Sequence, residues 1–159
     1  MKQTKLFLSL LMLLTFSIGN VWGAEVTIST TETSGNSADG LISYSTAKET
    51  GSTAPAANNS GVKVYAKGTF TVSTLNENVT ITKIEYTYTL NSNKNNKRPT
   101  IDGAKGTNSD GIWDATNKTW TGADKSITLS TSGDAGNTQI SQIVVTYTIG
   151  SSTETTVTS

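Results

Sequence analysis

Alternation of apolar and polar residues with a period of two is the feature that most constrains this chain. Val26 and Ile28 take alternate positions in "EVTIS" (25–29), and "GVKVYA" (61–66), "GTFTVST" (68–74) and "SITLS" (126–130) continue the pattern. Successive side chains of a strand point to opposite faces of a sheet, so this period predicts half-buried β-strands. No segment sustains the 3.6-residue apolar period that an amphipathic helix requires.

Turn-forming residues separate these segments. The connecting runs are "TSGNSADG" (33–40), "NSNKNNK" (91–97), "GTNSDG" (106–111) and "SGDAGN" (132–137). Gly, Asn and Asp tolerate positive φ or bond their own backbone, which ends strands. Many short strands at this spacing predict an all-β fold, which we interpret as an antiparallel β-sandwich, jelly-roll-like, with about eight strands.

One segment is echoed within the chain. "ITKIEYTYTL" (81–90) matches "ISQIVVTYTI" (140–149), and the preceding "TFTVST" (69–74) matches "SITLST" (126–131). Ile81 and Ile84 are three residues apart, so they cannot share one face of a regular strand. Either a β-bulge near 82–83 and 141–142 restores the phase, or the strands start at Ile84 and Ile143. Because "GVKVYA" has no second copy, we interpret the echo as two hairpins of one sandwich, which could place one in each sheet.

The N-terminus predicts export. Lys2 and Lys5 precede an apolar run over residues 6–18, which is shorter than the roughly 20 residues that span a bilayer. This pattern is typical of a signal peptide over 1–23, cleaved after Gly23, although a buried apolar helix is the alternative. We therefore expect a β-sandwich domain over 24–150, a Ser/Thr-rich tail or linker over 151–159, and no membrane span after cleavage. The expected location is secreted, extracellular or at the cell surface.

Composition excludes several kinds of chemistry. The chain has no histidine and no cysteine, which removes the common nucleophile systems and zinc sites with nitrogen or sulfur ligands. It has no basic stripe and one arginine, which argues against nucleic-acid binding. Its aspartates lie in turn sequences, so we expect a protein that is not an enzyme and needs no cofactor.

The loop that contains both tryptophans of the mature chain is the best candidate for a ligand site. Aromatic rings can stack on the apolar faces of sugars while polar side chains bind the hydroxyls. The candidate ligand-binding residues are Trp113, Trp120, Asp110, Asp114 and Asn117. Packing in the core remains the alternative for both tryptophans. No metal is expected, apart from a weak case for Ca²⁺ at Asp110 and Asp114, with Asn108 and Asn117 as further oxygen donors.

Several motifs together resemble a β-sandwich module found near the N-terminus of secreted Bacteroidetes surface proteins. The matching residues are Gly51, Ser52 and Pro55, then Val62, Val64 and Tyr65, then Ile81 and Ile84, then Trp120 and Gly122, then Ile140 and Ile143. The resemblance covers about residues 26–149, although "PAANN" lacks the tyrosine that often follows the proline. It implies a bacterial secreted or surface protein and brings no catalytic residues with it.

Three hypotheses follow from the sequence. The leading one is a secreted, non-catalytic module that binds glycans or other cell-surface protein modules. The second is a structural spacer of a larger secreted protein, with no ligand of its own. The third is a hydrolase that uses two facing aspartates, which the turn positions of these residues disfavour.

Overall fold

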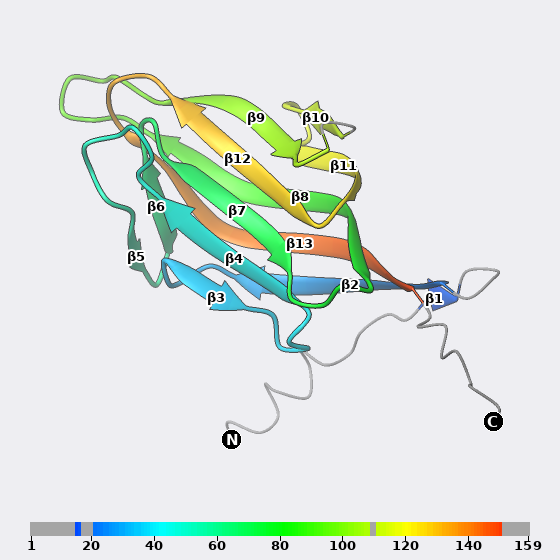
Figure 1. Ribbon diagram of the computed structural model, residues 1–159. Helices are drawn as coiled ribbons and strands as arrows, with labels where there is room; N and C mark the ends of the chain where they lie inside the picture. The colour runs from blue at the N-terminus through cyan, green and yellow to red at the C-terminus, as the bar shows by residue number, and fades with distance from the viewer. Residues whose placement is uncertain (1–14, 17–20, 109–110, 151–159) are drawn as a thin grey trace, which may run out of the picture.

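The computed structural model describes residues 15–16, 21–108 and 111–150, and this part of the chain is all-β (Figure 1). It contains thirteen strands: β1 (Thr15–Phe16), β2 (Val21–Ser29), β3 (Ser34–Asn36), β4 (Ile42–Ala47), β5 (Ala56–Asn58), β6 (Gly61–Tyr65), β7 (Thr69–Thr74), β8 (Val79–Asn91), β9 (Thr100–Gly106), β10 (Ile112–Asp114), β11 (Thr119–Asp124), β12 (Ser126–Ser132) and β13 (Asn137–Gly150). Within the described residues there is no helix long and apolar enough to cross a membrane.

The strands form two antiparallel sheets that pack face to face (Figure 1). The larger sheet has the order β1-β2-β13-β8-β11-β10, and β6 joins it beside β13 with β5 at its outer edge. The smaller sheet has the order β3-β4-β7-β12-β9. The predicted antiparallel sandwich is confirmed, with the chain crossing between sheets as in a jelly roll. The strand number is wrong, because short strands such as β3, β5 and β10 have too few residues to show alternation in the sequence.

The core follows the predicted alternation. Phe70 and Val72 of β7 and Ile127 and Leu129 of β12 are buried, while the residues between them lie on the outer face of the smaller sheet. Each such side chain stabilises the fold by about 1.5–3 kcal/mol when fully buried. Four tyrosines, Tyr44, Tyr86, Tyr88 and Tyr147, are also buried in the core.

Both predicted β-bulges are present. Along the β8–β13 ladder, Thr82 has no partner between the pairs formed by Ile81 and Lys83, and Ser141 has none between Ile140 and Gln142. Each extra residue shifts the phase of its strand by one position. All the isoleucines at 81, 84, 140 and 143 are therefore buried, so the bulge is the correct one of the two explanations.

The hairpin interpretation of the echo is wrong. β7 and β12 lie in the smaller sheet and pair with each other, whereas β8 and β13 lie in the larger sheet and pair with each other. Each echoed segment is thus a strand in one sheet followed by a strand in the other. Sequence similarity alone does not distinguish this crossing from a hairpin, because both have two strands and a turn.

The structure extends the echo to a repeat of five strands. In the first unit, β4 pairs with β7, β5 pairs with β6, and β6 pairs with β13. In the second unit, the equivalent pairs are β9 with β12, β10 with β11, and β11 with β8. Strands β4–β8 therefore correspond in order to β9–β13. The two units meet around a pseudo-two-fold axis at the central pair of Thr71 and Thr128, whose hydroxyl oxygens lie 3.0 Å apart. The second copy of "GVKVYA" is β11, which keeps the position of that strand without its sequence.

The N-terminal strand lies outside this repeat. β2 pairs along residues 142–150 of β13 and begins at Val21, which lies ahead of the predicted cleavage point after Gly23. Cleavage there would leave residues 24–29 to pair with β13. The cleavage site remains a prediction, and most of the predicted signal peptide, together with the tail over 151–159, lies outside the described residues.

Candidate functional site

The two tryptophans of the predicted site face the core. Trp113 of β10 pairs with Trp120 of β11, and directly opposed residues of an antiparallel ladder share one face. Trp120 is fully buried, so in this structure it has no ring face to offer to a sugar. Trp113 is partly buried and packs edge-to-face on Tyr86, with ring centroids 5.8 Å apart. The packing alternative holds for Trp120, and Trp113 packs against the core while it stays partly exposed.

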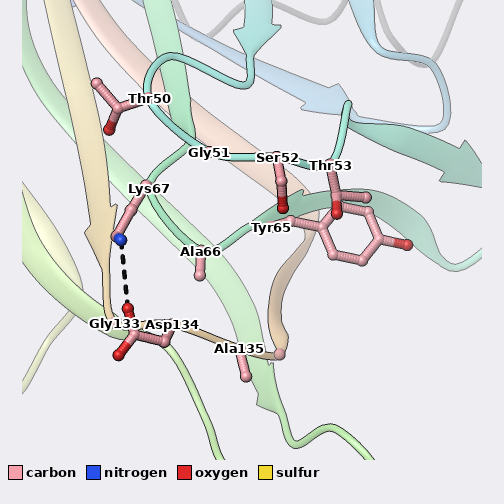
Figure 2. A pocket seen from close by; sticks show the side chains of 11 residues that line it. Thr50, Gly51, Ser52, Thr53, Tyr65, Ala66, Lys67, Gly133, Asp134 and Ala135 are labelled. Atoms are coloured by element: carbon pink, nitrogen blue, oxygen red, sulfur yellow. Dashed lines mark ion pairs between the residues drawn. The ribbon is translucent and has the colours of Figure 1, made fainter.

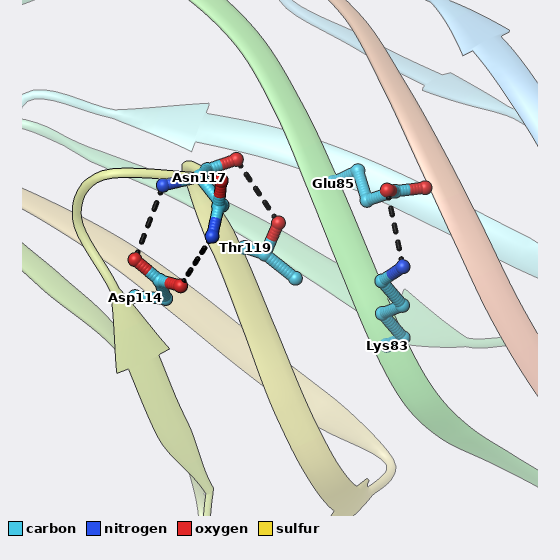
Figure 3. A network of polar contacts seen from close by, with 5 residues as sticks. All are labelled: Lys83, Glu85, Asp114, Asn117 and Thr119. Atoms are coloured by element: carbon cyan, nitrogen blue, oxygen red, sulfur yellow. Dashed lines mark hydrogen bonds and ion pairs between the residues drawn. The ribbon is translucent and has the colours of Figure 1, made fainter.

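Asp114 and Asn117 form a closed turn between β10 and β11 (Figure 3). One carboxylate oxygen of Asp114 accepts hydrogen bonds from the backbone N–H groups of Thr116 and Asn117, at 2.9 and 3.1 Å. The other accepts one from the Asn117 side-chain amide at 2.7 Å. These bonds, led by the backbone N–H of Asn117, lower the pKa of Asp114 below its usual value. Both oxygens of the carboxylate are therefore already engaged in hydrogen bonds within the turn.

Of the predicted calcium ligands, Asp114 and Asn117 are in contact within the described residues, and the role of Asp110 stays a prediction. Asp110 lies outside them, and within them no three acidic side chains converge on one point. Asn108 belongs to a different contact, in which its backbone N–H donates to Asp124 at 2.8 Å.

A shallow hollow of about 340 Å³ adjoins the Asp114 turn on the outer face of the larger sheet. Its other side is formed by Lys83 and Glu85 of β8, which form an ion pair of 3.1 Å. Thr119 and Thr121 of β11 form its floor. The hollow is polar but contains no aromatic ring, so it offers hydrogen bonds without a stacking surface.

A deeper pocket lies at the end of the sandwich where three loops meet, and we call it the end pocket (Figure 2). Its volume is about 220 Å³, and its lining comes from residues 50–53 between β4 and β5, 65–67 between β6 and β7, and 133–136 between β12 and β13. The sequence analysis assigned these segments to turns and to a structural motif. No pattern within a single loop predicts the pocket, because the three loops are far apart in the chain.

Close backbone packing makes the end pocket rigid. A β-carbon on Gly51 would lie only 2.6 Å from the carbonyl oxygen of Ala66, so the two loops touch through glycine. Gly136 has a φ of +81°, a conformation that side chains other than hydrogen rarely adopt. The Thr131 hydroxyl lies 3.0 Å from the carbonyl oxygens of both Tyr65 and Gly68, which ties β12 to the β6–β7 turn.

The end pocket combines an aromatic ring with several polar groups. Tyr65 is half-buried and lines one side of the pocket (Figure 2). Across the pocket, the ammonium group of Lys67 lies 3.2 Å from the carboxylate of Asp134, which is 83% exposed. Hydroxyl groups of Thr50 and Ser52 complete the rim. Because the ion pair is exposed, both charges can exchange partners with a ligand at little cost.

No protein-family model, no curated protein and no solved structure matches this chain.

Proposed function

We propose that this protein is an exported, non-catalytic module that binds glycans through the end pocket. The observation that carries the proposal is the half-buried Tyr65 in a rigid concave site with hydroxyl groups, a cation and a carboxylate around it. An aromatic ring stacks on the apolar face of a sugar, and converging polar groups bind its hydroxyls. The predicted signal peptide supports export, since glycans of other cells are reached outside the cell.

The end pocket replaces the tryptophan loop as the binding site in this proposal. Trp120 is buried and Asp114 is held in its turn, so neither is free to contact a sugar as the structure stands. Burial of Trp120 also favours the second candidate function, a structural spacer with no ligand. The spacer and the binding module differ in whether the end pocket has affinity for any sugar.

A glycan array followed by titration separates these candidates. We expect binding to at least one neutral oligosaccharide, with Tyr65→Ala weakening it up to about tenfold, the size of one aromatic contact. Tyr65→Phe should keep the affinity, because the stacking surface remains. The matched control is Thr119→Ala in the hollow beside Asp114, which should have no effect. If the unmodified protein binds no sugar, or if Tyr65→Ala binds as well as the parent, the proposal is wrong.

A further inference from the structure

The five-strand repeat duplicates the loops of the sandwich as well as its strands. The end pocket is built by the β4–β5, β6–β7 and β12–β13 connections. Because β4–β8 correspond to β9–β13, the equivalent connections are β9–β10, β11–β12 and β7–β8. These three lie together at the other end of the sandwich, where β9 and β7 end and β12 begins (Figure 1).

The equivalent loops also enclose a concave surface, which we call the opposite hollow. One part of it, about 360 Å³, is lined by Thr107, Asn108, Asp124 and Lys125 with two neighbouring residues. A second part, about 400 Å³, shares Lys125 and extends over the β7–β8 loop to Leu75. Concave surfaces therefore occur at both positions related by the pseudo-two-fold axis.

The framework of the opposite hollow is as firmly bonded as that of the end pocket. The Asp124 carboxylate accepts hydrogen bonds from the backbone N–H groups of Asn108 at 2.8 Å and Lys125 at 2.7 Å. The Lys125 ammonium group donates to the carbonyl oxygens of Glu77 and Val79. These contacts join all three loops, so the hollow keeps its shape without a ligand.

The surface chemistry of the two sites is related but unequal. Tyr65 gives the end pocket an aromatic ring, whereas the residues that line the opposite hollow include none. It has instead an exposed leucine, Leu75, whose side chain is 51% accessible beside polar groups of Lys125 and Ser126. An aliphatic side chain also covers the apolar face of a sugar, but with less contact area than a ring.

We infer that the opposite hollow is a second site for neutral oligosaccharides, with Leu75 in the role of Tyr65, which makes the chain bivalent. This inference rests on the proposed function. The sites lie at opposite ends of β7 and β12, strands of six and seven residues, and so are separated by roughly 25 Å. A compact sandwich cannot place both sites on adjacent sugars of one chain, so it cross-links separate glycan chains and gains avidity on a dense glycan surface.

Nuclear magnetic resonance titration of the whole folded protein tests the inference. The probes are hexasaccharides of glucose, xylose, mannose and galactose, added to the isotope-labelled chain while backbone amide shifts are followed. We expect two separate groups of shifts with the same sugar, one around Tyr65 and a weaker one around Asn108 and Lys125. Leu75→Ser should abolish the second group alone, and Tyr65→Ala should weaken the first alone.

Each outcome decides between the proposals. Shifts confined to the end pocket at saturation would overturn the second site and leave the proposed function standing. Shifts confined to the opposite hollow would overturn bivalency and the assignment of the end pocket together, and no shifts with any probe would overturn both proposals. A further check is cross-linking, because the bivalent parent should precipitate a soluble polysaccharide of the sugar it binds, whereas Leu75→Ser should not.

Discussion

Replacement of Tyr86 by phenylalanine should stabilise the protein. The Tyr86 hydroxyl is buried in the core and has no hydrogen-bond partner among the described residues. A buried polar group without a partner costs about 1–3 kcal/mol, because it has given up water and gained nothing. Tyr86→Phe keeps the ring that packs on Phe70 and Trp113, whose centroids lie 6.2 and 5.8 Å away.

The expected gain is about 1 kcal/mol in the free energy of unfolding, the lower end of that range, since the vacated oxygen leaves a small void. Urea unfolding measures this gain as a higher midpoint with an unchanged slope, and thermal unfolding measures it as a rise of roughly 4 °C. The matched control is Tyr147→Phe, because the Tyr147 hydroxyl donates to the Asp39 carboxylate at 2.5 Å. Loss of that bond should destabilise the protein by about 1.5–3 kcal/mol.

The same variant should alter the response to alkaline pH. Burial raises the pKa of Tyr86 far above the value of about 10 in the unfolded chain. A raised folded-state pKa contributes stability that is complete below about pH 10 and is lost as the pH rises further, because only the unfolded chain then ionises readily. The unfolding free energy of Tyr86→Phe should therefore fall less steeply above pH 10 than that of the parent. The reasoning is refuted if Tyr86→Phe loses stability at neutral pH or keeps the parent's alkaline slope.

Three further perturbations follow from the described contacts. Asp124→Ala should destabilise the protein by about 1–3 kcal/mol at pH 7. Burial alone raises the pKa of Asp124, but three backbone N–H bonds lower it overall. The stability difference between the parent and Asp124→Ala should therefore shrink as the pH falls through the folded-state pKa of Asp124, which unfolding measured at acid pH tests. Gly61→Ala should lower the melting temperature much more than Gly40→Ala, because both glycines have positive φ but only at Gly61 would a β-carbon overlap the backbone of β13; equal losses would contradict this. Thr71→Val and Thr128→Val should each cost about 0.5–1 kcal/mol, and a double-mutant cycle should show coupling between them, since their hydroxyl oxygens lie 3.0 Å apart at the centre of the pseudo-symmetric sheet.

Sequence analysis located the local features of the fold because they depend on nearby residues. The alternation of Phe70 with Val72 and of Ile127 with Leu129 placed these side chains in the core. The spacing of Ile81 and Ile84 raised the possibility of a bulge at Thr82, since one inserted residue changes which face the following side chains occupy. Turn residues such as those of 132–137 marked the ends of strands.

The candidate site was harder to predict because it joins loops from distant parts of the chain. Trp113 and Trp120 surround a polar turn in the sequence, but the β10–β11 register turns both towards the core. Conversely, Lys67 and Asp134 form their ion pair only because β7 pairs with β12 and brings their loops together. A local sequence motif does not show which distant loops will come into contact.

The sequence by itself determined that this chain forms strands and which side chains of the alternating segments face the core, and it reduced the two phase breaks to a bulge or a strand start. Only the tertiary structure decided that β8 pairs with β13, that each echoed segment crosses between the sheets, and that two five-strand units interlock around Thr71 and Thr128. The physical reason is the distance along the chain over which each feature is decided. Side-chain alternation is set by the geometry of successive residues, whereas pairing between distant strands depends on which arrangement buries both apolar faces and satisfies the backbone of the whole chain.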